Sequence, residues 1–355
     1  MNRIALFLPN WIGDVVMATP AIRAVHEAFP AADLFAVGKP YVADVVEGSP
    51  WFKEFLPFNK SGPRSQRLLS LAARLRHEKI DAAVLFPNSF RSALAARLGG
   101  AKTIVGFARY GRGFLLSNRL EAERDARGRF VPKPVIDDYN RLAMALGTTD
   151  PGHRMKLFTT DADEAAAAAV WQRFNLERFS KVVAVNPGAA FGASKHWPGE
   201  SFADLTRKLT RSHDCGVIVL CGPSERDIAR SIAMTSRCPR VFSLAEEKLS
   251  LGLTKAIVRR CDLLVTTDSG PRHFAAAFDR PVVTLFGPTH IEWTETYFDK
   301  AIHLQQKVPC GPCQLRVCPL DHRCMKSLTA ETVLKASEQL LARHTHSTPG
   351  ERRAG

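Results

Sequence analysis

Residues 4–29 have the sequence IALFLPNWIGDVVMATPAIRAVHEAF. This stretch decides the fold, because an unbroken apolar run at 4–8 has the length of one buried strand, and residues 15–29 continue with apolar residues at helical spacing. The turn 9–14 separates the two. A strand followed at once by a helix is half of a β-α-β unit, so the stretch predicts a parallel sheet covered by helices.

The same alternation continues along most of the chain. We expect further strands at 34–37, 82–86, 103–105, 181–185, 216–221, 263–266 and 282–286. We expect helices at 15–29, 66–77, 89–98, 134–146, 161–174, 201–212, 225–235, 251–260, 272–278 and 329–343. The predicted fold class is α/β, with two doubly wound Rossmann-like domains that face each other across a cleft. Ligands of such sheets bind at the carboxyl ends of strands, so the chemistry is expected in the loops that follow strands.

Length and a polar stretch define the expected domains. The chain has 355 residues, too many for one ordinary core. The Pro- and Gly-containing residues 148–160 interrupt the alternation, which is typical of a connection between domains. The predicted order is an N-terminal domain at 1–150, a linker at 151–160, a C-terminal domain at 161–328, a helix at 329–344 and a disordered tail at 345–355.

Composition narrows the class of protein and of partner. The chain is 45% hydrophobic and 24% charged, as in globular proteins that fold in water, and no apolar run approaches the ~20 residues that span a bilayer. The run 4–8 is too short for a secretory signal, so we expect a cytoplasmic protein. The net charge of +14 favours an anionic partner. Without a basic block or a nucleic-acid-binding motif, an acidic small molecule or a membrane-surface glycolipid fits better than nucleic acid.

Gly13 and Asp14 come directly after the first predicted strand and begin a helix. Gly13 lets a ligand approach the backbone closely, and a carboxylate at a helix start can act as a general base. The alternative is that Asp14 is an N-cap residue with no role beyond satisfying backbone amides.

Two loops of the second half could bind phosphate. Residues 186–198, NPGAAFGASKHWP, hold small residues that leave backbone amides available and Lys195 as a point charge. The alternative is a flexible loop with a solvated lysine. Residues 266–273, TTDSGPRH, join a strand to a helix whose first amides suit phosphate, with Ser269 and His273 as further donors. The alternative is a capped helix with a core-facing histidine.

We do not expect a metal ion to neutralise the negative charge of a bound diphosphate. Asp161 and Asp163 have the spacing of a metal-binding pair, but they begin an Ala-rich helix, where acidic residues are ordinary. Lys195 and helix amides are expected to do this instead. The first half contributes arginines and lysines that suit carboxylates and phosphates, or that form a solvated face: Lys60, Arg64, Arg67, Arg91, Arg109, Arg112 and Arg119.

The eight cysteines fall into two groups. Four lie singly in or near apolar runs and are expected to be buried: Cys215, Cys221, Cys238 and Cys261. The other four, Cys310, Cys313, Cys318 and Cys324, lie close together near His322. They suit either a structural, tetrahedral zinc site or a set of reduced thiols that pack the loop before the last helix.

Together the three motifs resemble the ADP-heptose:lipopolysaccharide heptosyltransferase family, which has the GT-B fold. Residues 8–20, LPNWIGDVVMATP, are similar to its type II members. The resemblance implies that Asp14 is the base, that Lys195 and residues 268–273 hold the donor diphosphate, and that the loop 222–225 lies beside the nucleoside, with Glu225 on the ribose. It assigns residues 1–150 to the acceptor and 161–328 to the nucleotide sugar.

The implied site has three parts. Catalysis is assigned to Asp14 and Lys195. Donor binding is assigned to Gly188, Ser194, Lys195, Glu225, Asp268, Ser269, Gly270 and His273. Acceptor binding is assigned to Asn10, Trp11, Gly13, Lys60, Arg64, Arg67 and Arg91.

The implied reaction is an inverting transfer of heptose from ADP-heptose to the inner core of lipopolysaccharide. The resemblance to type II members implies that the second heptose is added. No cofactor is required. The acceptor would be met at the cytoplasmic membrane surface, with the enzyme peripheral to the inner membrane. A related transferase with another sugar or acceptor, or a non-catalytic nucleotide-sugar-binding protein, would share these motifs. A dinucleotide oxidoreductase is disfavoured because the G-x-G-x-x-G fingerprint is missing.

Overall fold

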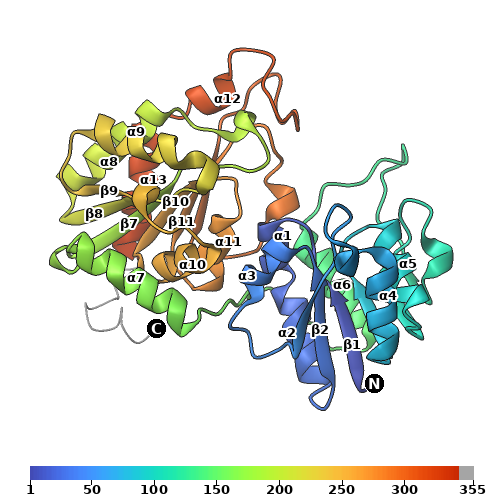
Figure 1. Cartoon of the computed structure of the whole chain (residues 1–355). Helices are drawn as coiled ribbons and strands as arrows, with labels where there is room; N and C mark the ends of the chain where they lie inside the picture. Colours follow the sequence, from blue (N-terminus) through green and yellow to red (C-terminus); the bar gives the residue numbers. More distant parts are fainter. Residues whose placement is uncertain (344–355) are drawn as a thin grey trace. The chain divides into compact units, whose positions relative to one another are not determined.

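The computed structural model describes residues 1–343. The predicted tail at 345–355 and the last residue of the predicted helix 329–344 lie outside the described residues. The chain divides into two compact units (Figure 1). The first contains Met1–Phe158 and Glu292–Tyr297, and the second contains Thr159–Ile291 and the chain from Phe298 onward.

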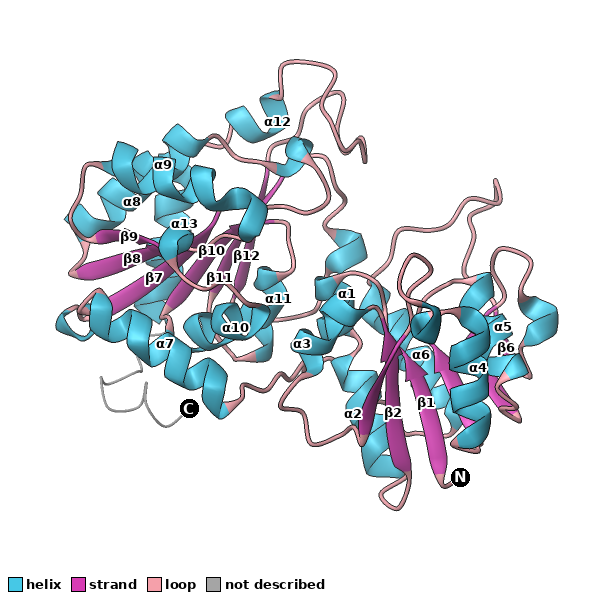
Figure 2. Cartoon of the chain, viewed as in Figure 1, coloured by secondary structure: helices cyan, strands magenta, loops and turns pink. Residues whose placement is uncertain are grey.

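The first unit is a parallel six-stranded sheet in the order β3-β2-β1-β4-β5-β6. Its helices cover both faces of the sheet, with α2 packed on α6 and α4 packed on α5 (Figure 2). The strands are β1 Arg3–Phe7, β2 Asp33–Gly38, β3 Glu54–Pro57, β4 Ala82–Leu85, β5 Thr103–Phe107 and β6 Asn118–Leu120. The helices are α1 Ile12–Met17, α2 Thr19–Ala28, α3 Ala43–Val46, α4 Leu68–His77, α5 Phe90–Leu98 and α6 Val135–Leu146.

The second unit repeats this topology, with the order β12-β11-β10-β7-β8-β9 and all neighbours parallel. The strands are β7 Lys181–Asn186, β8 Cys215–Val219, β9 Val241–Ser243, β10 Leu263–Thr267, β11 Val282–Phe286 and β12 Ala301–Gln305. The helices are α7 Asp161–Arg173, α8 Gly199–Ser212, α9 Arg226–Ser236, α10 Leu251–Arg260, α11 Pro271–Ala277, α12 Arg323–Lys326 and α13 Ala330–Arg343. The α/β, doubly wound prediction is confirmed for each unit.

The central strands are buried on both faces, which explains their unbroken apolar sequences. In β1, Ile4, Ala5 and Leu6 have no exposed surface. Three of the four isolated cysteines, Cys215, Cys221 and Cys261, are buried as predicted, and Cys238 is half-buried.

The predicted helix at 15–29 is wrong, because the structure breaks it into α1 and α2 at Ala18. Pro20 is the cause. Proline has no N–H to donate to the carbonyl of Val16, four residues earlier, and its ring crowds that carbonyl. The hydroxyl of Thr19 donates to the Val16 carbonyl instead, at 2.6 Å. The break makes α1 a separate helix of 6 residues directly after β1.

Four strands were not expected from the sequence: β3, β6, β9 and β12. They are the outermost strands of the two sheets, and most of their residues are exposed or half-buried. An edge strand has one open side, so it does not carry the continuous apolar run that identified the central strands.

Each sheet changes the direction of its strand order once, between β1 and β4 in the first unit and between β7 and β10 in the second. Ligands of doubly wound sheets bind outside the carboxyl ends of the strands at such switch points. No helix within residues 1–343 is both long enough and apolar enough to cross a membrane.

Candidate active site

Asp14 lies beyond the carboxyl end of β1, in the first turn of α1. The N-cap residue of α1 is Trp11, so Asp14 does not have the capping position that the alternative interpretation required. Burial raises the pKa of the Tyr139 hydroxyl on α6 well above its usual range, and the negative charges of Asp14 and Asp138 add to the rise. Asp14 therefore lies near α6, half-buried, at the switch point of the first sheet.

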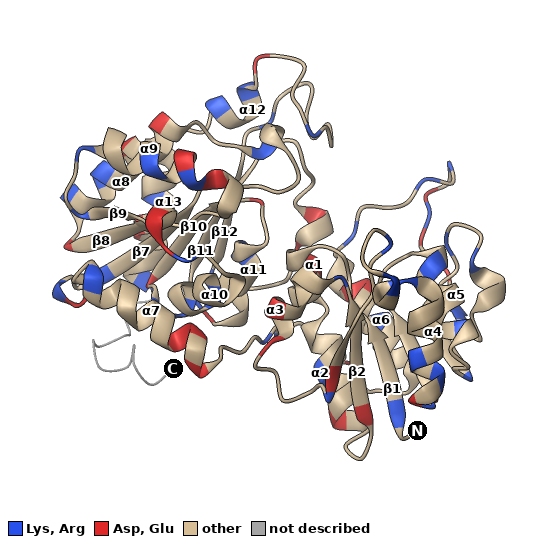
Figure 3. Ribbon diagram, in the orientation of Figure 1, with Lys and Arg blue, Asp and Glu red and all other residues tan. Residues whose placement is uncertain are grey.

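The predicted acceptor-binding residues come from loops at the same edge of this sheet. They precede or begin α1 (Asn10, Trp11, Gly13), lie between β3 and α4 (Lys60, Arg64, Arg67), or begin α5 (Arg91). Figure 3 shows basic residues on the loops that lead into α4 and α5. Lys60, Arg64 and Arg67 are exposed, and Arg91 is half-buried, with its guanidinium 5.9 Å from the ring centre of Phe58.

Arg112 differs from the rest of the predicted basic set because it is fully buried. Its guanidinium donates to the carbonyls of Phe107 (2.9 Å), Pro87 (2.6 Å) and Ser89 (3.1 Å). It also donates to the side-chain oxygen of Asn88, at 3.1 Å. Burial, with a contribution from the charge of Arg109, lowers the pKa of Arg112 to about 10, so it remains a cation at neutral pH. Arg112 is a structural anchor between two loops and not a solvated cation.

In the second unit, the loops after β7, β8 and β10 meet at the switch point. Gly188, after β7, lies so close to Glu225 that an added Cβ would come within 2.2 Å of both carboxylate oxygens. Glu225 Oε2 accepts a hydrogen bond from the amide of Gly222, at 2.8 Å. The close approach explains the glycine at position 188.

Lys195 and Asp268 form a buried ion pair that joins the first and third of these loops. The ammonium donates to Asp268 Oδ2 at 2.5 Å and to the Asp268 carbonyl at 3.0 Å. The two side chains are only 11% and 6% exposed. The solvated-lysine alternative is therefore wrong, because this lysine is held inside the unit by a carboxylate.

Asp268 is ionised in this setting. Burial alone would raise the pKa of its carboxyl, but the charges of Lys195 and Arg272 and hydrogen bonds from Lys195 and Thr289 outweigh burial and lower the pKa. The hydroxyl of Thr289 donates to Asp268 Oδ2 at 2.7 Å, and Arg272 lies 3.5 Å from Oδ1. The carboxylate thus fixes the position of Lys195 at the carboxyl edge of the sheet.

A polar network continues beside this pair. The hydroxyl of Thr267 donates to the Gly188 carbonyl at 2.6 Å. The side-chain amide of Asn186 lies 2.9 Å from Ser269 Oγ and 3.0 Å from Thr266 Oγ1. Ser269 and Gly270 lie between β10 and α11. The result is a small-residue loop, a cation and hydroxyl groups at one edge, an arrangement that suits a phosphorylated ligand.

Comparison with known proteins identifies the family. The sequence profile of Glycosyltransferase family 9 (heptosyltransferase) matches residues 68–323, more than half of the chain. This chain belongs to that family. The lipooligosaccharide heptosyltransferase 2 of Campylobacter jejuni (serotype O:2) is 29% identical over 348 residues, which cover 96% of this chain and 98% of that protein.

Two solved structures share the fold of this glycosyltransferase. The Escherichia coli ADP-heptose lps heptosyltransferase II has a TM-score of 0.77 and 23% identity, and covers 98% of this chain and 100% of that one. A family 9 glycosyl transferase from Veillonella parvula has a TM-score of 0.81 and 21% identity, and covers 96% and 97%. The predicted GT-B architecture and the predicted glycosyltransferase class are confirmed.

Two predicted donor-binding residues of the family 9 enzyme are turned inward. Burial lowers the pKa of His273 well below its usual value. The side chain is 3% exposed, so His273 faces the core, as the alternative interpretation of this loop stated. Ser194 is 2% exposed. Its hydroxyl donates to the Leu315 carbonyl at 2.5 Å, and its own carbonyl lies 2.6 Å from His322 Nε2. Ser194 therefore ties the Lys195 loop to the cysteine-rich segment.

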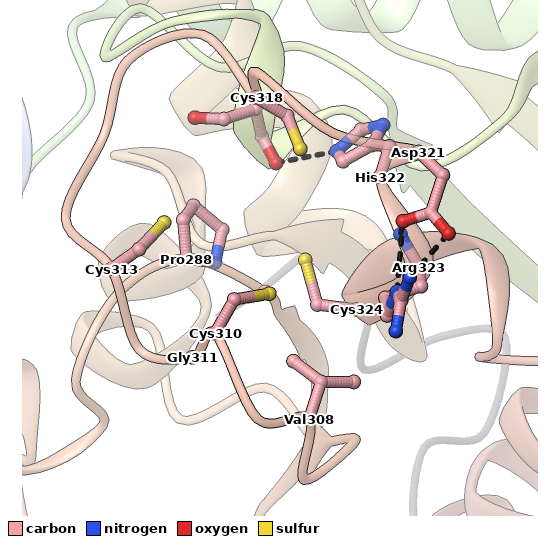
Figure 4. A pocket seen from close by; sticks show the side chains of 12 residues that line it. Pro288, Val308, Cys310, Gly311, Cys313, Cys318, Asp321, His322, Arg323 and Cys324 are labelled. Carbon is pink, nitrogen blue, oxygen red and sulfur yellow. Dashed lines mark hydrogen bonds and ion pairs between the residues drawn. The ribbon is translucent and has the colours of Figure 1, made fainter.

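The four clustered cysteines of this glycosyltransferase line one small cavity with His322 (Figure 4). All four are free thiols. Among residues 1–343, no group of three or more His, Cys, Asp or Glu side chains is arranged to hold a metal ion. The zinc site stays a prediction.

The sequence assigned no individual role to several residues of the donor-side network: Asn186, Thr267, Arg272 and Thr289. Arg272 had a usable signal, because it follows Asp268 by four residues at a helix start and can reach back to it. Thr289 had none, since it approaches Asp268 from the loop after β11.

Proposed function

We propose that this enzyme transfers heptose from ADP-heptose to the inner core of lipopolysaccharide, adding the second heptose with inversion at the anomeric carbon. The Campylobacter relative that aligns over nearly the whole chain is called lipooligosaccharide heptosyltransferase 2, which supports the sugar and the acceptor. The Escherichia coli structure is described as an ADP-heptose lps heptosyltransferase II, which supports the donor. The observation that carries the proposal is the buried Lys195–Asp268 pair beside Gly188 and Glu225 at the switch point of the second sheet.

The second unit would bind the donor. Glu225 uses Oε2 for the Gly222 amide, and Oε1 would accept a ribose hydroxyl. Gly188 leaves room for the Glu225 carboxylate, which lies where a side chain at position 188 would otherwise stand. The ammonium of Lys195 has three hydrogens, of which two are directed at Asp268, and the third would donate to the diphosphate together with the Ser269 hydroxyl.

The first unit would bind the acceptor and provide the base. Asp14 would take the proton from the acceptor hydroxyl while that oxygen forms a bond to the anomeric carbon. The bond from this carbon to the diphosphate oxygen breaks, and ADP leaves with the electron pair. Lys195 stabilises the negative charge that develops on the diphosphate, an electrostatic contribution that is often the largest in such reactions. Arg64, Arg67, Arg91 and Lys60 would bind phosphate or carboxylate groups of the acceptor.

We further propose that transfer requires no metal ion and takes place in the cytoplasm, at the surface of the inner membrane. A fixed lysine supplies the positive charge that a divalent ion would otherwise provide. The net charge of +14 favours the anionic inner leaflet, where each nearby basic residue adds about 1 kcal/mol of attraction.

The test is a transfer assay with purified enzyme, ADP-heptose and a lipopolysaccharide acceptor whose core ends at the first heptose. Mass spectrometry should find the acceptor heavier by one heptose, with ADP released in equal amount. An acceptor without the first heptose serves as the control and should stay unmodified. No transfer from ADP-heptose, or transfer to the control acceptor, would reassign the substrate.

A further inference from the structure

Three loops at one edge of the first unit contain basic residues and no acidic ones. They are residues 58–69, 87–91 and 108–116, with Lys60, Arg64, Arg67, Arg91, Arg109 and Arg112. Asp and Glu make up 35 of the 355 residues, so loops of this combined length would carry about two or three. All three loops follow the carboxyl ends of strands, namely β3, β4 and β5. These three loops are therefore attractive to anions.

The same loops carry large apolar side chains that are exposed to solvent. Phe114 is 75% exposed, Leu69 74%, Tyr110 71% and Phe90 42%. The rings of Phe90 and Phe114 lie 6.1 Å apart, so these two form one patch. Single exposed apolar residues are common, but a group of them surrounded by cations marks an interaction surface.

The patch has a fixed position because Arg112 joins its two loops. Arg112 lies between Tyr110 and Phe114 in the sequence, and its guanidinium bonds to the carbonyls of Pro87 and Ser89 directly before Phe90. A buried side chain with these bonds holds residues 108–116 against the start of α5. The exposed rings are thus presented by an ordered support.

We propose that this surface, defined by Leu69, Phe90, Tyr110 and Phe114 with Lys60, Arg64, Arg67, Arg91 and Arg109, docks the enzyme on a bilayer that contains anionic lipid. Cations bind the headgroups, and aromatic and aliphatic side chains enter the boundary between headgroups and acyl chains. A soluble sugar phosphate would use the cations but not the rings, which is why a lipid surface is the better match. Docking would bring the enzyme to its acceptor, which is anchored in lipid, so this proposal rests on the proposed function.

The test measures co-sedimentation of the purified full-length enzyme with vesicles of phosphatidylcholine alone or mixed with phosphatidylglycerol. The wild type should bind the mixed vesicles, bind phosphatidylcholine alone more weakly, and dissociate as salt rises. The double variant Tyr110→Ser, Phe114→Ser should bind the mixed vesicles about tenfold more weakly, because it removes two of the inserting side chains. Met234→Ser, which replaces an apolar residue of the second unit that is 72% exposed, should bind as the wild type does.

Activity on two acceptors separates docking from catalysis. The double variant should match the wild type on a delipidated core oligosaccharide and lose activity on the same acceptor embedded in vesicles. Wild-type vesicle binding by the double variant overturns the proposal. The proposal is also overturned if the wild type forms a dimer, the double variant does not, and both bind vesicles equally. The patch then contacts a second copy of the chain. If vesicle binding behaves as expected but no heptose is transferred, the proposed function fails while the docking surface stands.

Discussion

Replacement of Lys195 by methionine should destabilise the second unit through its buried partner. The ion pair is 2.5 Å long and its side chains are 11% and 6% exposed, so solvent does little to weaken it. Removing one member of a buried pair typically costs about 3–5 kcal/mol, since a charge is left without its counter-ion. Arg272 and Thr289 still contact Asp268, so we expect a loss near the lower end, about 3 kcal/mol. For a unit of this size that corresponds to a fall in Tm of roughly 6–12 °C.

Scanning calorimetry gives the measurement, with the transition of the second unit identified as the one that ADP shifts upward. Lys248→Met is the matched control, because Lys248 is exposed, and it should change stability by no more than about 0.5 kcal/mol. The double variant Lys195→Met, Asp268→Asn removes both charges and should recover part of the loss.

The loss should also depend on pH. The pKa of Asp268 is lowered in the folded protein from a reference value of 3.8, so its contribution to stability is present above that value and is lost as pH falls through the folded pKa. The difference between wild type and Lys195→Met should therefore narrow below about pH 4. A cost under about 1 kcal/mol at pH 7, or an equal cost at pH 7 and pH 3, would refute the reasoning.

Four further outcomes follow from the site. Asp14→Asn should keep ADP affinity and lower kcat by ~10²–10⁴-fold, the usual contribution of a general base; turnover near that of the wild type would remove Asp14 from this role. Gly188→Ala should leave the fold intact, because the flexible Glu225 side chain can swing away, but weaken ADP binding about tenfold by calorimetric titration, with no added loss when combined with Glu225→Ala. Arg64→Glu should raise the acceptor KM and leave donor affinity unchanged, which kinetics with each substrate varied would check. Activity should survive EDTA. Elemental analysis with thiol titration separates the two interpretations of the clustered cysteines, which are one zinc per chain, or no metal and four reactive thiols.

The sequence predicted the centre of each sheet and missed its borders, for a physical reason. A strand such as β1 has helices on both faces, and burial of nearly every residue leaves a continuous apolar run. The edge strand β12, with every residue half-buried, has no such pattern. The loops that follow central strands were therefore located correctly, and Asp14, Lys195 and Asp268 lie after such strands, while their roles stay predictions.

The contacts between these loops could not be predicted in the same way. Lys195 and Asp268 are 73 positions apart, and their pairing arises only because β7 and β10 are neighbours in the sheet. The closeness of Gly188 to Glu225 has the same origin, since β7 also pairs with β8. A lysine in a small-residue loop looks solvated in the sequence, and its burial becomes apparent only once the order of the strands is known.

Arg112 affects which substitutions the first unit can accept without a change in its backbone. Three of the four groups that its guanidinium binds are main-chain carbonyls, and every residue type supplies a carbonyl. The support under residues 110 and 114 therefore does not depend on which side chains stand there. Those two positions can diverge between relatives, or accept a fluorescent label, while the backbone beneath them keeps its shape.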